Sequence, residues 1–156
     1  MRITARLIGA MLLSFTALKA RTIELPLYGF KIDALDGPLA SIQNQAVLVL
    51  FLPETEGFVP SVNVMIRSYE QGIEPYIALS KAELADKKLS IISETQIPDG
   101  WIVEYAGRLL DQSLHFYAKA LSKPGKIYLV TATAKESQWG SVGDALRQSV
   151  DSFETR

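Results

Sequence analysis

The chain has 156 residues, of which 48% are hydrophobic, so it is long enough for one ordinary core and too short to suggest two. Its formal net charge of −1, with no basic run interleaved with aromatic residues, excludes the electrostatic pattern of a nucleic-acid-binding protein. It contains no cysteine, which excludes disulfides, thiolate catalysis, cysteine metal ligands and a lipid-modified N-terminal cysteine.

The first 20 residues have the composition of a secretory signal peptide. Arg2 and Arg6 form a positively charged start, residues 7–18 are almost wholly apolar, and Ala20 is a small residue at which cleavage can occur. An uncleaved membrane anchor is the alternative, but an apolar run of about a dozen residues is shorter than the roughly 20 that span a bilayer. We therefore expect cleavage between Ala20 and Arg21, a periplasmic or secreted protein, and no stable membrane span after cleavage.

The next segment contains short apolar alternations and a turn. Residues 22–32 are interrupted by Pro26 and Gly29, which is typical of an edge strand or of two short extended pieces. Residues 33–38 contain two aspartates, which raises the question of calcium binding. The segment lacks the regular ligand spacing and closing glutamate of an EF-hand, so we interpret it as an ordinary turn.

Two strands and a helix are predicted next. Residues 46–52 form a continuous apolar run that ends at Pro53, and residues 60–68 alternate, so the two are expected to pair as a hairpin. The spacing of apolar residues then changes from the period of a strand to that of a helix. Residues 72–88 place apolar side chains on one helical stripe, and the opposite side carries charges that are typical of a solvated face.

The middle of the chain, from Trp101 to Lys135, contains three consecutive strands with apolar residues on both faces. Residues 89–97 precede them as a further strand, joined by a Pro-Asp-Gly turn. Residues 127–134 have apolar side chains on both faces, so we expect this strand to lie at the centre of the sheet. The last helix follows at about 138–153 and has a clear helical period.

These elements predict an α+β fold, a mainly antiparallel sheet of about six strands covered by helices on its faces. The expected organisation is a signal peptide at 1–20 and one domain at 21–156. Removing the signal peptide takes away three of the 16 Lys and Arg and none of the 17 Asp and Glu, so the mature net charge would be −4.

The order of the predicted elements and several short segments resemble the PsbP/Mog-type superfamily. The segments are Val62-Asn63-Val64 after Pro60, Tyr-Ala-Gly at 105–107, Tyr128-Leu129-Val130-Thr131 and the terminal Ser152-Phe153. The sequence looks closest to DcrB-like and PsbP-related bacterial domains of unknown function, over roughly residues 45–153. The resemblance implies an α/β/α sandwich and a binding role, since known roles include photosystem assembly, Ran binding and chaperoning of secreted effectors. It implies no catalytic residue.

One strand face supplies the predicted binding site. His115, Tyr117 and Lys119 alternate with apolar residues on the strand at 114–120, so they share its more polar face. We predict that this face binds a protein or small-molecule partner. His115 is the only histidine, and it is interpreted as exposed or packed on the sheet.

Two further sets of residues leave alternatives open. Five aromatic residues either line a ligand groove or, as we prefer, pack in the core: Trp101, Tyr105, Tyr117, Tyr128 and Trp139. Four acidic residues either attract a cation or, as we prefer, are solvated loop charges: Glu54, Glu56, Glu70 and Glu74. We predict no metal and no cofactor.

The functional prediction is an exported, non-enzymatic binding or accessory protein that docks a protein or small ligand on its sheet or helix surface. The sequence contains no Gly-x-Ser-x-Gly, no phosphate-binding glycine loop and no His-Glu-x-x-His. The alternative is a small metal-dependent or hydrolytic enzyme that uses His115 with nearby carboxylates. A cavity lined by His115 and two acids would favour this alternative.

Overall fold

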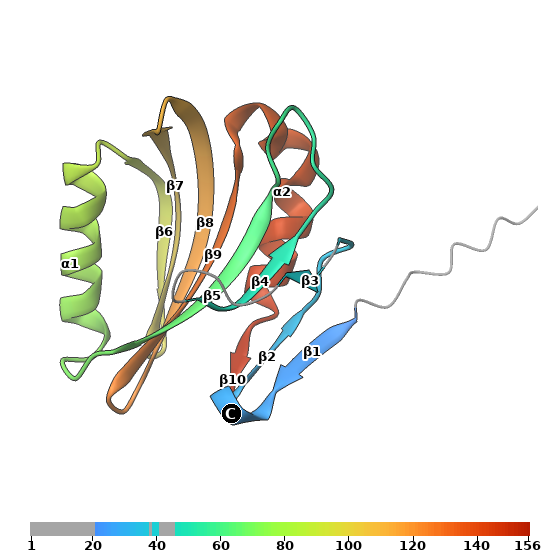
Figure 1. Ribbon diagram of the computed structural model, residues 1–156. Coiled ribbons are helices and arrows are strands. Elements are labelled where there is room, and N and C mark those ends of the chain that lie inside the picture. Colours follow the sequence, from blue (N-terminus) through green and yellow to red (C-terminus); the bar gives the residue numbers. More distant parts are fainter. Residues whose placement is uncertain (1–20, 38, 41–45) are drawn as a thin grey trace, which may run out of the picture.

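The larger of two antiparallel sheets forms the middle layer of the molecule (Figure 1). This computed structural model describes residues 21–37, 39–40 and 46–156. The expected signal peptide, residues 1–20, lies outside the described residues. In spatial order the sheet contains β3 (Leu39–Ala40), β4 (Ala46–Phe51), β5 (Ser61–Ser68), β9 (Lys126–Lys135), β8 (Gln112–Lys123), β7 (Gly100–Leu109) and β6 (Ser90–Ile97).

The strand predictions are confirmed in type and in pairing. β4 pairs with β5 and β6 with β7 as antiparallel hairpins, and β9 is the central strand of the seven. β9 suits this position because Ile127 faces one side of the sheet, Tyr128 and Val130 face the other, and all three are buried.

One helix lies on each face of the sheet (Figure 1). Helix α1 (Ile73–Asp86) lies on one face, and α2 (Glu136–Asp151) packs against β8 and β9 on the other. The helix at 72–88 is confirmed. The last helix begins at Glu136, earlier than the apolar period indicated, because Lys135 at the end of β9 directly precedes it and donates its backbone N–H to Gln138 at 3.0 Å.

A second, smaller sheet lies beside α2. It joins β1 (Thr22–Leu25), β2 (Phe30–Asp33) and β10 (Glu154–Thr155), with a 3-10 turn at Pro26–Tyr28 between β1 and β2. The expectation of two short extended pieces at 22–32 is therefore confirmed. The two pieces pair with each other because Pro26 and Gly29 turn the chain back on itself, and β2 also pairs with β10 at the C-terminus.

The two helices cover two separate hydrophobic clusters. The α2 cluster is the larger: Phe30, Ile32, Leu50, Val62, Val64, Tyr128, Val130, Ala132, Ala134, Trp139, Leu146, Val150 and Phe153. The α1 cluster is smaller: Ile73, Tyr76, Trp101, Val103, Ala118, Ala120 and Ile127. The α1 cluster is smaller because α1 packs less closely against the sheet and leaves space between them.

Gly107 allows the chain to pass close to β7. A Cβ atom at this position would lie 2.7 Å from Leu89 Cδ2 and 3.1 Å from the carbonyl oxygen of Lys88. The glycine of the Tyr-Ala-Gly segment therefore lets the connection after α1 lie directly against the sheet. Within the described residues, neither helix is long and apolar enough to cross a bilayer.

Candidate functional site

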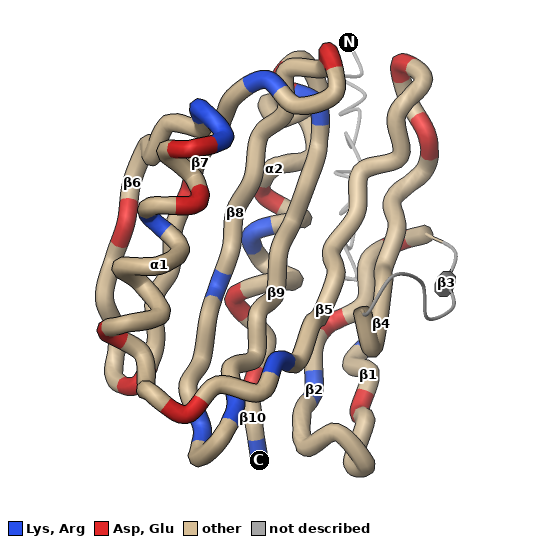
Figure 2. The backbone as a smooth tube through the Cα atoms, turned by 60° about the vertical axis from the view of Figure 1, so that its left-hand side comes forward, with Lys and Arg blue, Asp and Glu red and all other residues tan. Residues whose placement is uncertain are grey.

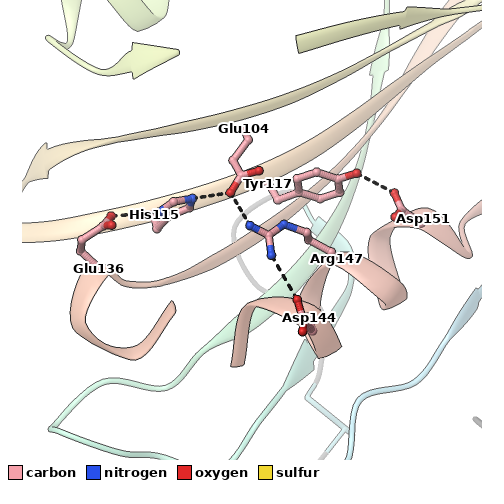
Figure 3. Close-up of polar contacts among 7 residues, drawn as sticks. All are labelled: Glu104, His115, Tyr117, Glu136, Asp144, Arg147 and Asp151. Carbon is pink, nitrogen blue, oxygen red and sulfur yellow. Dashed lines mark hydrogen bonds and ion pairs between the residues drawn. The ribbon is translucent and has the colours of Figure 1, made fainter. Parts of the chain in front are cut away.

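His115 lies at the centre of a polar network under α2 (Figure 3). Its Nε2 atom is 2.8 Å from Glu104 Oε1 on β7, and its Nδ1 atom is 2.9 Å from Glu136 Oε2 at the start of α2. The imidazole stacks on Trp139, with ring centroids 4.0 Å apart. Because a carboxylate only accepts, both ring nitrogens donate at once only when the imidazole is protonated.

Arg147 extends this network along α2. Its Nη2 atom donates to Glu104 Oε1 at 2.6 Å, and its Nη1 atom donates to Asp144 at 3.3 Å (Figure 3). Burial raises the pKa of Glu104, but hydrogen bonds from Arg147 and His115 outweigh this effect, so the pKa lies below its ordinary value. The hydrogen bond to Glu104 in turn raises the pKa of Arg147. The group is an ion-pair network that joins α2 to β7.

The other two predicted site residues also face α2. Tyr117 donates its hydroxyl to Asp151 at 2.9 Å, and Lys119 donates to the carbonyl oxygens of Asp151 and Phe153, both at 3.0 Å. The cation thus satisfies carbonyl groups at the C-terminal end of the helix. The structure brings His115, Tyr117 and Lys119 to one face as expected, but α2 covers that face. Their role in partner binding stays a prediction.

The centre of this network is buried, whereas the Glu136 side chain at its edge is 53% exposed. Only 7% of the His115 side chain and 13% of the Glu104 side chain are exposed, and their polar atoms contact protein groups. In the described part of the chain, no group of three or more His, Cys, Asp and Glu side chains is placed to hold a metal ion. The arrangement therefore suits positioning of α2 better than proton transfer to a bound molecule.

A cavity of about 270 Å³ lies between α1 and the sheet, on the opposite face from His115. We call it the α1 cavity. Its walls are mainly apolar and aromatic: Tyr76, Leu84, Leu89, Trp101, Val103, Tyr105, Leu109, Phe116, Ala118 and Leu129. Its remaining lining residues are Arg67, Ser80, Glu83 and Lys87. A concave apolar site with a few polar groups is the usual form of a small-molecule site.

Aromatic rings form the floor of the α1 cavity. Tyr105 on β7 stacks against Phe116 on β8, with centroids 4.8 Å apart and planes 11° from parallel. Burial raises the pKa of Tyr105 to about 12, with a smaller contribution from Tyr76, so the phenol is neutral at neutral pH. The floor is thus aromatic and uncharged.

The structure divides the aromatic residues that the sequence analysis grouped together. Trp101 and Tyr105 line the α1 cavity, whereas Tyr117, Tyr128 and Trp139 contact the α2 side. Core packing and groove lining therefore both occur, on opposite faces. Sequence reasoning missed Phe116 and Tyr76 as cavity residues. The only sequence signal for these two residues was their periodicity. Tyr76 falls on the apolar stripe of α1, and Phe116 falls on the apolar face of β8.

The four acidic residues do not form one cluster. Glu54 and Glu56 lie between β4 and β5, Glu70 lies between β5 and α1, and Glu74 lies in the first turn of α1. Figure 2 shows acidic residues separately at these two ends of β5. Such a separation agrees with solvated charges and gives no joint cation site. A more open hollow, of about 570 Å³, lies beside Asp111 and Lys135, and the residues that line it are all of polar or charged types.

Comparisons with known proteins establish the fold of this chain. No family model matches it, and no curated protein matches it in sequence. Among solved structures, cyanobacterial PsbP from Synechocystis sp. PCC 6803 matches with a TM-score of 0.64 and 14% identity, over 96% of this chain and 99% of that one. The chain has a PsbP-like fold. The resemblance to the PsbP/Mog-type superfamily is thereby confirmed at the level of the fold.

Two further structures share this PsbP-like fold with the chain. PA94 from Pseudomonas aeruginosa, a protein of unknown function, has a TM-score of 0.60 and 14% identity, over 88% of this chain and 97% of that one. LpqN from Mycobacterium tuberculosis, which is involved in cell envelope biogenesis, has a TM-score of 0.56 and 12% identity, over 88% of this chain and 86% of that one. At these identities the likeness shows the shared fold.

Proposed function

We propose that this chain is an exported, non-enzymatic binding or accessory protein that binds a small, mainly apolar ligand in the α1 cavity. The single observation that carries the proposal is the cavity itself, which combines aromatic walls with a polar rim. Its volume of about 270 Å³ is just below the roughly 300 to 1,000 Å³ typical of ligand sites. The ligand is therefore small.

The contrast with the His115 network supports binding over catalysis. Nucleophilic and acid–base catalysis need a polar group that reaches the substrate, usually oriented by a second group. His115 is oriented by Glu104 and Glu136, but it faces α2 and does not line the α1 cavity. The alternative, a hydrolytic or metal-dependent enzyme built on His115, would require α2 to move away from β8.

Export is supported by the N-terminal sequence and by the involvement of one structural neighbour in cell envelope biogenesis. Residues 1–20 have the charge and apolar pattern of a signal peptide, and LpqN is involved in cell envelope biogenesis. Cyanobacterial PsbP and LpqN also lend an accessory role some support by analogy of fold. Ligand binding outside the cytoplasm is the function that fits these observations together.

A neutral fluorescent probe tests the proposal. N-phenyl-1-naphthylamine should bind the wild-type protein and increase in fluorescence, because the cavity removes it from water. Ala118 lines the cavity and is 3% exposed, so Ala118→Leu should fill part of the space and lower probe affinity by about tenfold. Leu129→Trp fills the same space from β9 and serves as a second variant if Ala118→Leu is poorly folded.

Ala82→Leu is the matched control. Ala82 is an exposed residue on α1 that does not line the cavity, so the same change in side chain there should leave probe binding at the wild-type level. A wild-type protein that does not enhance probe fluorescence would overturn the proposal. So would two folded cavity variants that bind the probe as well as Ala82→Leu does.

A further inference from the structure

We infer that the α1 cavity takes a single-chain amphiphile with an anionic head, in the class of a medium-chain fatty-acid anion. The apolar chain lies along the aromatic floor and the head group contacts Arg67 at the rim. This inference rests on the proposed function, because it names the ligand of the same cavity. It adds a charge preference, which the apolar walls alone do not predict.

The cavity volume limits the length of the chain. At about 30 Å³ for each water-sized group, 270 Å³ holds roughly nine such groups, which corresponds to an alkyl chain of about eight to ten carbons. A diacyl lipid would place most of its apolar surface outside a cavity of this size. The volume therefore favours a monomeric amphiphile with one chain over a diacyl lipid or a membrane surface.

The rim of the cavity has more positive than negative charge. Arg67 on β5 and Lys87 directly after α1 are cationic, and Glu83 on α1 is the one carboxylate among the lining residues. All three side chains are exposed, so a charged head group can reach them from solvent. Figure 2 shows charges of both signs along α1. The balance at the rim favours an anionic head over a neutral or cationic one.

Arg67 is the rim residue best placed to hold that head. It lies near the end of β5, opposite Ile127 of β9, and none of the ion pairs among the described residues involves it. A guanidinium group offers donors in a planar fork that matches a carboxylate. Arg67 is therefore available for a bidentate contact with a ligand carboxylate.

Arg67 and Tyr76 both line the α1 cavity, so the cation lies beside the apolar space. Burial raises the pKa of Tyr76, and the positive charge of Arg67 is the largest effect that opposes it. The two groups thus lie close enough to interact, and Tyr76 is 6% exposed in the cavity wall. A chain whose head group contacts Arg67 can lie against Tyr76 and the stacked rings of Tyr105 and Phe116, which line the same cavity.

Competition against N-phenyl-1-naphthylamine tests the charge preference. The competitors are decanoate, decanol and decyltrimethylammonium, which share a ten-carbon chain and differ in head-group charge. Decanoate should displace the probe at the lowest concentration. Added sodium chloride should weaken the binding of decanoate but not that of decanol, because salt screens the charge interaction. Because the probe is neutral, its own binding reports whether the cavity is open and the variant is folded.

Two charge variants make the test specific. Arg67→Gln should lower the affinity for decanoate by roughly two- to fivefold, the range expected for an exposed ion pair, and should leave the affinity for decanol unchanged. Glu83→Gln should raise the affinity for decanoate by a similar factor, because it removes the repulsion between the Glu83 carboxylate and the ligand carboxylate. Arg108→Gln is the control, since Arg108 is an exposed arginine that does not line the cavity.

The outcomes separate this inference from the proposed function. If the probe binds but the three competitors act equally, or if Arg67→Gln and Arg108→Gln give the same decanoate affinity, the anionic-head inference is wrong while the cavity remains a binding site. If the probe itself does not bind the wild-type protein, the proposed function fails first.

Discussion

Arg147 on α2 donates a hydrogen bond of 2.6 Å to Glu104 on β7, a residue 43 positions earlier in the chain. The same carboxylate oxygen is 2.8 Å from His115. Arg147 also lies over the Trp139 ring, with its Cζ atom 5.0 Å from the centroid. This relationship ties the last helix to the sheet through charge, aromatic stacking and hydrogen bonding together.

Removing Arg147 should loosen α2. Arg147→Met keeps much of the apolar stem but leaves the part-buried Glu104 with His115 as its remaining partner, so we expect a loss of about 1 to 2 kcal/mol in the free energy of unfolding. Urea denaturation measures this loss in the free energy of unfolding. Arg108→Met, at an exposed ion pair 3.8 Å long, should change stability by no more than about 0.5 kcal/mol. Equal losses would show that the network does not hold the helix.

Glu104 should make stability depend on acid pH. Its pKa in the folded state lies below the ordinary value of 4.5, so its ionised form stabilises the fold above that pH. The contribution is lost as pH falls from about 4.5 through the lower, folded pKa. The difference in unfolding free energy between wild type and Glu104→Gln should therefore be largest near neutral pH and narrow in acid.

Urea denaturation between about pH 7 and about pH 3.5 checks this dependence. Glu83→Gln, at an exposed position on α1, is the control and should change the free energy of unfolding little. A constant difference for Glu104→Gln across this range would mean that the ionised carboxylate does not stabilise the fold.

The apolar face of α2 gives a direct prediction on the core. Leu146 is 0% exposed at the centre of this face, so Leu146→Asp should bury an unpaired carboxylate and destabilise by at least about 3 kcal/mol. Leu79→Asp makes the same substitution on α1, where the leucine is 49% exposed, and should cost much less. Chemical denaturation compares the two, and equal midpoints would contradict the assigned helix face.

Export predicts a defined N-terminus. The charged start and the short apolar run favour cleavage after Ala20, so the protein recovered from its native compartment should begin at Arg21. Intact-mass measurement decides the point. A full-length species that remains integral to the membrane would mean that the N-terminal segment is an anchor.

The sheet could be predicted from sequence because alternation reports directly which side chains share a strand face. β8 is an example: Phe116 and Ala118 line one face and His115 and Tyr117 the other, as the period of two requires. Alternation does not report what covers a face. The polar face of β8 was expected to be accessible, and it is covered because Glu104, Glu136 and Arg147 supply partners from other elements.

Other features had no local signal at all. β10 has two residues, Glu154 and Thr155, which is too short to show any alternation, so its pairing with β2 depends on tertiary contacts. The α1 cavity likewise joins Arg67, Leu89 and Phe116, which come from separate parts of the chain. Periodicity assigned several of these residues to apolar faces, but the distance between α1 and the sheet is set by packing of the whole fold.

Methyl NMR with N-phenyl-1-naphthylamine tests the central claim, that the α1 cavity is the ligand site, most directly. An aromatic probe in the cavity should shift the methyl resonances of Leu84, Leu89 and Leu129, which line it, and leave Leu146 under α2 unchanged. Shifts confined to residues beside His115, Tyr117 and Lys119, or no shift at a saturating probe concentration, would contradict the claim.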